Sequence, residues 1–135
     1  MSEKLVLDSF ALVSLFHREP GWQSVQDALY HQERTHSRAL LSWINWGEFY
    51  YIVKRRVGAT KTMEALRLLE QLPIDLFPVD QPLVHRAAEI KSEHALSYAD
   101  AFCVATAQRV DATVLTGDPE FESVERLIRI RWLKK

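Results

Sequence analysis

Short apolar runs alternate with segments of helical periodicity along this chain of 135 residues, and this alternation constrains the fold most strongly. The runs predict strands over residues 4–8, 38–41, 74–79, 112–116 and 127–133. The segments between them predict helices over residues 9–17, 22–34, 43–57, 60–72, 81–94 and 98–109, with a further short helix opened by Asp118-Pro119. Strands that alternate with helices form parallel sheets, so we expect an α/β fold with a mostly parallel central sheet flanked by helices.

The length and composition predict one soluble domain over residues 1–135. The 47% of hydrophobic residues can build a sizeable core, and no apolar stretch approaches the length of a membrane span. The N-terminus lacks the pattern of a signal peptide. The single cysteine, Cys103, excludes a disulfide framework or zinc site within one chain, and we expect it to be buried. A reducing, cytoplasmic setting without a membrane partner follows as the expectation.

Four acidic residues each follow or interrupt an apolar stretch, where a charge is costly unless it has a partner. They are Asp8 in KLVLDSF, Glu48 in NWGEFYYIV, Asp100 in LSYADAFCVATA and Asp118 in VLTGDPEF. Clustered carboxylates raise each other's pKa, and a divalent cation would relieve their repulsion. Ligands of a parallel sheet bind outside the carboxyl ends of its strands, where Asp8 and Asp118 are expected to lie. The pattern therefore predicts a site for a hard ion such as Mg²⁺ or Mn²⁺.

Each of these residues also has a purely structural interpretation. Asp8 and Asp118 could each cap the helix that follows them, and Asp100 fits a capping-box pattern. Glu48 lies in the middle of a helix and has no capping role, but it could pair with Arg55 or occupy an exposed edge. The sequence alone leaves these alternatives open.

The order and the sequence motifs of these segments resemble those of the PIN-domain ribonucleases, most closely the VapC-type toxins of bacterial toxin–antitoxin pairs. The resemblance spans nearly the whole chain and is most specific in L-S-Y-A-D-A and L-T-G-D-P-E-F. It implies a PIN-like three-layer sandwich in which the acidic residues hold one or two Mg²⁺ or Mn²⁺ ions and cleave RNA. By resemblance, these metal-binding and catalytic residues are Asp8, Glu48, Asp100 and Asp118. Ser9 and Thr116 match polar positions that support the site.

The function that the resemblance implies is a metal-dependent endoribonuclease that acts as the toxin of a toxin–antitoxin pair. A cognate antitoxin protein and a homodimer are its implied partners, besides the RNA substrate. Surplus aromatic residues within nine positions also favour an interface: Trp43, Trp46, Phe49, Tyr50 and Tyr51. The alternative is a catalytically inactive PIN-like module that binds RNA or protein.

The overall charge permits a nucleic-acid partner without indicating one. The formal net charge is −1, and removing the four carboxylate charges through metal binding leaves +3. The run Lys54, Arg55 and Arg56 could contact RNA phosphates. Cations at the end of a helix also favour its dipole, so a structural role for the run is an equal alternative.

Overall fold

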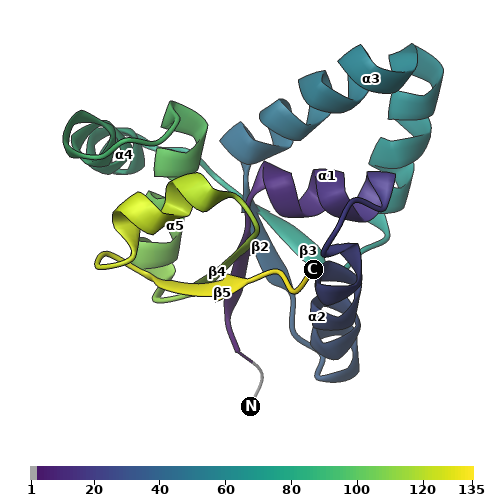
Figure 1. Ribbon diagram of the computed structural model, residues 1–135, viewed down its shortest axis with the longest axis horizontal. Coiled ribbons are helices and arrows are strands. Elements are labelled where there is room, and N and C mark those ends of the chain that lie inside the picture. Colours follow the sequence, from purple (N-terminus) through teal and green to yellow (C-terminus); the bar gives the residue numbers. More distant parts are fainter. Residues whose placement is uncertain (1–2) are drawn as a thin grey trace.

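The computed structural model describes residues 3–135 and is built around a five-stranded sheet (Figure 1). The strand order is β3-β2-β1-β4-β5, so the first strand of the chain occupies the centre. The strands are β1 Leu5–Leu7, β2 Ala39–Ser42, β3 Ile74–Phe77, β4 Thr113–Thr116 and β5 Arg129–Trp132. All four neighbouring pairs of these strands are parallel, which confirms the predicted mostly parallel sheet.

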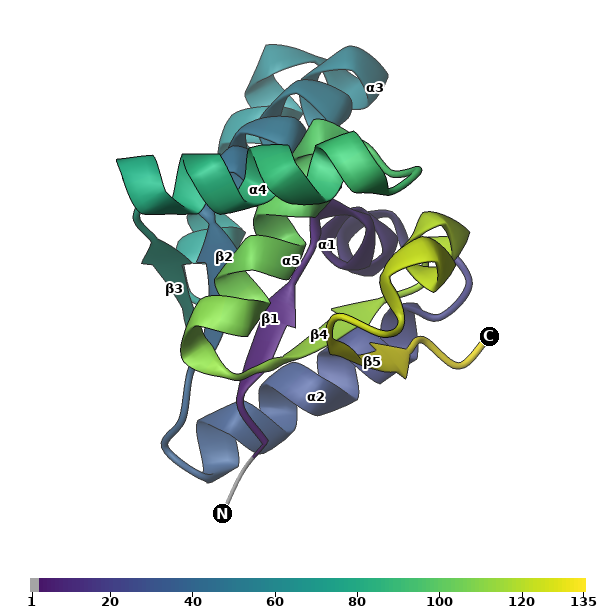
Figure 2. The same cartoon turned by 90° about the vertical axis from the view of Figure 1, so that its left-hand side faces the viewer.

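Helices connect the strands, as parallel pairing requires. They are α1 Ser9–His17, α2 Trp22–Arg34, α3 Trp43–Glu70, α4 Gln81–Glu93, α5 Tyr98–Val110 and the 3₁₀ helix η1 Pro119–Val124. The two views together place α1 and α2 on one face of the sheet and α4 and α5 on the other (Figures 1 and 2). No helix in residues 3–135 has both the length and the apolar character needed to span a membrane.

The central strands β1, β2 and β4 are largely buried and are covered by helices on both faces, which confirms a three-layer sandwich. Side chains alternate along a strand, so Leu5 and Leu7 of β1 join the cluster that contains the apolar residues of α1 and α2. Val6 joins the opposite cluster, built with α4 and α5. In β4, Leu115 likewise joins the cluster on the side of α1 and α2, and Val114 joins the cluster on the side of α4 and α5. Strands covered on both faces read as continuous apolar runs, which is why they are visible in the sequence.

The long helix α3 is interrupted at Gly58, where the sequence predicts the end of one helix. Gly58 has φ 83° and ψ 177°, a conformation that residues with a Cβ rarely adopt. Helical structure resumes directly afterwards and continues to Glu70. The part before Gly58 carries Glu48 toward the carboxyl ends of β1 and β4, and the glycine lets the rest of the helix turn away.

Candidate metal centre

Asp8 lies directly after β1 and is fully buried. Its Oδ1 accepts a hydrogen bond from the backbone N–H of Ala11 at 2.9 Å, so Asp8 does cap α1. Its Oδ2 accepts a bond from the hydroxyl of Thr116, at the end of β4, at 2.5 Å. The capping role and the clustered position are therefore compatible, because the carboxylate has two oxygens.

The Thr116 hydroxyl joins Asp8 to the loop that carries Asp118. It accepts a hydrogen bond from the backbone N–H of Asp118 at 3.0 Å while it donates to Asp8. Asp118 in turn accepts from the backbone N–H of Glu120 at 2.9 Å and begins η1, as its alternative interpretation predicts. Thr116 thus links the carboxylate of Asp8 to the backbone of Asp118.

Glu48 approaches the same region from α3. The hydroxyl of Ser9 donates a hydrogen bond to Oε1 of Glu48 and fixes that half-buried carboxylate against the start of α1. The guanidinium of Arg55 lies 5.1 Å from the centre of the Tyr51 ring. Among the ion pairs of residues 3–135, none joins Glu48 to Arg55, so that alternative is excluded for this structure.

Asp100, in the first turn of α5, is only 4% exposed. In a capping box, its carboxylate would accept the backbone N–H of Ser97, the N-cap residue. That N–H instead donates to Oε2 of Glu120 at 3.3 Å, while the Ser97 hydroxyl accepts from the backbone N–H of Asp100 at 3.1 Å. The helix is therefore capped by Ser97 and Glu120 together, and Asp100 is not used as a capping-box acceptor.

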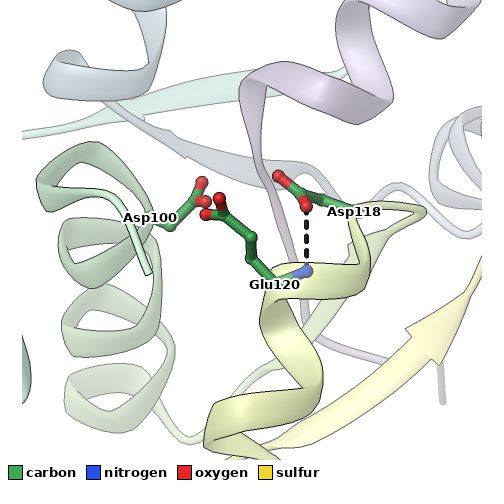
Figure 3. Close-up of side chains that lie close together, drawn as sticks. All are labelled: Asp100, Asp118 and Glu120. Carbon is green, nitrogen blue, oxygen red and sulfur yellow. Dashed lines mark hydrogen bonds between the residues drawn. The ribbon is translucent and has the colours of Figure 1, made fainter. Parts of the chain in front are cut away.

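Three carboxylates form the tightest acidic cluster in the described part of the chain (Figure 3). Asp100, Asp118 and Glu120 each place one oxygen within 4.8 Å of the others. Sequence reasoning missed Glu120, because a glutamate at the start of a short helix is ordinary and only the tertiary approach of α5 to η1 gives it a neighbour. Its position two residues after Asp118 was the one available signal.

Burial raises the pKa of Asp8 to about 7 and that of Asp100 to about 8. For Asp8, the hydrogen bonds from Thr116 and Ala11 oppose this effect, while the negative charges of Asp118 and Glu48 add to it. For Asp100, the charges of Asp8, Asp118 and Glu48 raise the pKa further. The four acidic positions singled out in the sequence thus lie within electrostatic range of one another.

Cys103 is fully buried, as expected.

The donor set fits a hard divalent cation. It consists of oxygen atoms only, and two of the carboxylates are held in surroundings that disfavour their charged form without a cation. Glu48, Asp100, Asp118 and Glu120 line one cleft of about 500 Å³.

Lys54, Arg55 and Arg56 are consecutive, but their side chains have different contacts. The Lys54 amino group lies 6.0 Å from the Tyr50 ring centre, and Arg55 lies over Tyr51. Arg56 lines the acidic cleft and pairs with Glu19 at 3.3 Å.

Comparison with known proteins agrees with the fold. A family model described as PIN domain matches residues 5–127. A chain in the crystal structure of VapBC2 from Rickettsia felis, bound to a DNA fragment from their promoter, superposes with a TM-score of 0.77. It is 14% identical over 94% of this chain and 96% of that chain. A search of curated protein sequences finds no match.

Two other solved structures share the fold at similarly low identity. VapC20 from Mycobacterium tuberculosis, described as a sarcin-ricin loop cleaving toxin, gives a TM-score of 0.71. It is 16% identical over 90% of this chain and 95% of that chain. A chain of a toxin–antitoxin complex from Klebsiella pneumoniae gives a TM-score of 0.65. Its identity is 23%, over 90% of this chain and 92% of that chain.

Proposed function

This chain belongs to the PIN-domain family, and on that premise we propose that it is a Mg²⁺- or Mn²⁺-dependent endoribonuclease, the toxin of a toxin–antitoxin pair. The observation that carries the proposal is the buried Asp100 beside Asp118 and Glu120 at the wall of an open cleft. Burying one carboxylate among others lowers the stability of the fold, and a bound cation would offset that loss.

In this proposal Asp100, Asp118 and Glu120 hold the ion, and Asp8 contacts it directly or through water. When bound, the cation would activate a water molecule and offset negative charge on the phosphoryl oxygens. Thr116 keeps Asp8 oriented, and Ser9 does the same for Glu48. Glu48 would bind the ion or position the attacking water, since its carboxylate lines the cleft.

The proposed partners are an RNA substrate, a cognate antitoxin and a second copy of the chain. The Klebsiella pneumoniae structure is a toxin–antitoxin complex, which supports the antitoxin by analogy of fold. Exposed aromatic side chains support a protein interface: on α3, Trp43 is 46% exposed and Tyr51 is 45% exposed. We place the protein in the cytoplasm on the same analogy.

The direct test is incubation of the purified protein with total cellular RNA, with and without Mg²⁺ or Mn²⁺, followed by mapping of new RNA ends. The proposal expects new ends at discrete positions only when metal is added. RNA binding without new ends under either metal would favour the inactive PIN-like module instead.

A further inference from the structure

The cleft that contains the acidic cluster runs along the seam between α1 and α3. Ser9 at the start of α1 contacts Glu48, and Glu19 just after α1 contacts Arg56. The two helices therefore lie side by side in the same direction, with one polar contact at each end. Ser9, Glu48, Glu19 and Arg56 all line the cleft.

The two ends of this seam differ in charge: one end holds the acidic cluster, and the other holds the ion pair of Arg56 with Glu19. Glu48, Ile52 and Arg56 recur every four residues, so they follow one face of α3. At about 1.5 Å per residue, Arg56 lies about 12 Å along the helix axis from Glu48. Between the two ends the lining is mostly apolar, formed by Phe10, Val13 and Ser14 of α1 and by Ile52 of α3. A ribose or base can pack on such a surface while a phosphate cannot.

Arg56 is positioned to bind an anion. Its contact to Glu19 uses Nη1, and both side chains are more than 40% exposed. An exposed pair of this kind is weak, so it leaves the guanidinium free to contact a ligand. Arginine has five N–H donors in a planar fork that matches a phosphate, and one contact to Glu19 leaves others for a ligand.

We propose that Arg56 binds a backbone phosphate of the RNA other than the one being cut, so that the seam between α1 and α3 is the track of the RNA strand. This assignment rests on the proposed ribonuclease function. A stacked strand advances about 3.4 Å per nucleotide, and an extended strand advances further. A span of about 12 Å therefore places the contacted phosphate two to about four phosphates from the cut.

The test uses a single-stranded RNA oligonucleotide that spans a cut mapped with the wild-type enzyme. Binding is measured on the Asp118→Asn background, so that the RNA is not consumed. Arg56→Ala is expected to weaken binding about 10-fold and to reduce the slope of log affinity against log salt by about 0.7. Arg56→Lys keeps the charge and should recover part of the loss. The matched control is Arg55→Ala, which removes the neighbouring arginine held on Tyr51, and it should change binding less than twofold.

A set of oligonucleotides, each with one neutral methylphosphonate, then locates the contact. At one position, two to about four phosphates from the cut, the neutral linkage should weaken binding to the protein that retains Arg56. The same linkage should have no further effect on binding to Arg56→Ala. The assignment is overturned if Arg56→Ala and Arg55→Ala bind alike, or if every substitution weakens both proteins equally, while the wild-type enzyme still cuts RNA. A wild-type protein that cuts no RNA overturns the proposed function itself, and this assignment with it.

Discussion

The hydroxyl of Thr116 donates a hydrogen bond to Oδ2 of Asp8 at 2.5 Å, although the two residues are 108 positions apart. The contact follows from the sheet, because β1 and β4 are parallel neighbours and pair Leu7 with Leu115. Asp8 and Thr116, which follow this pair, therefore meet at the carboxyl edge of the sheet. Thr116 favours the charged form of Asp8 there, since its hydrogen bond lowers a carboxyl pKa that burial raises.

Thr116→Val should impair the site more than the fold. The substitution preserves shape but removes the donor to Asp8 and the acceptor of the Asp118 N–H. We expect cleavage to fall about 10–100-fold, the usual effect of losing a group that orients a metal ligand. Stability should fall by about 1–2 kcal/mol, measured by urea unfolding. Thr116→Ser, which keeps the hydroxyl, is the control, and equal activity of the two variants would contradict this role.

Glu120→Gln should weaken binding of Mn²⁺ at least 10-fold by titration calorimetry, because it removes one of three clustered carboxylates. Glu122→Gln is the matched control, since it makes the same chemical change at an exposed position of the same short helix. If both variants bind Mn²⁺ like the wild type, Glu120 is not a ligand.

Fold and site differed in how far the sequence could predict them. The central strands β1, β2 and β4 are largely buried, so their apolar runs were visible in the sequence. Gly58 and Asp80 marked helix boundaries that the structure confirms. The convergence of Asp8 and Asp118 followed from parallel-sheet geometry alone. Glu120 could not be foreseen, because its role depends on how η1 packs against the start of α5, a contact that no periodicity encodes.

The stability of the metal-free protein should fall as the pH rises from 5 to 8.5. Asp8 and Asp100 have pKa values of about 7 and 8 in the folded state, above their ordinary value of 3.8. The folded protein therefore holds more protons than the unfolded chain over this range, and their contribution is lost as the pH rises through 7 and 8. Melting temperatures in EDTA measure the fall.

Two comparisons isolate this effect from other titrating groups. Asp100→Asn should flatten the fall, because the amide does not titrate. Millimolar Mg²⁺ should raise the melting temperature most at high pH, where the carboxylates are free to bind it. The prediction is contradicted if the melting temperatures of the wild type and of Asp100→Asn, both in EDTA, change with pH in the same way. Asp100 would then not have the raised pKa described above.

The exposed aromatic residues of α3 should mediate dimerisation. Trp43→Ser combined with Tyr51→Ser removes two large exposed rings, and light scattering should show a shift from dimer toward monomer. Tyr30→Ser is the control, since Tyr30 is 64% exposed but lies on α2. A wild-type protein that is monomeric at high micromolar concentration would refute the interface.

The most direct test of the central claim measures RNA cleavage by the wild-type protein, Asp118→Asn and Asp111→Asn, each with Mn²⁺ and with EDTA. Asp111→Asn makes the same change at the exposed end of α5, where Asp111 pairs with Arg129. We predict cleavage only with Mn²⁺, undiminished in Asp111→Asn and reduced by more than about 100-fold in Asp118→Asn, beyond the loss typical of a supporting residue. Cleavage that persists in EDTA, or that survives in purified Asp118→Asn at the wild-type rate, would contradict a metal-dependent site built on these carboxylates.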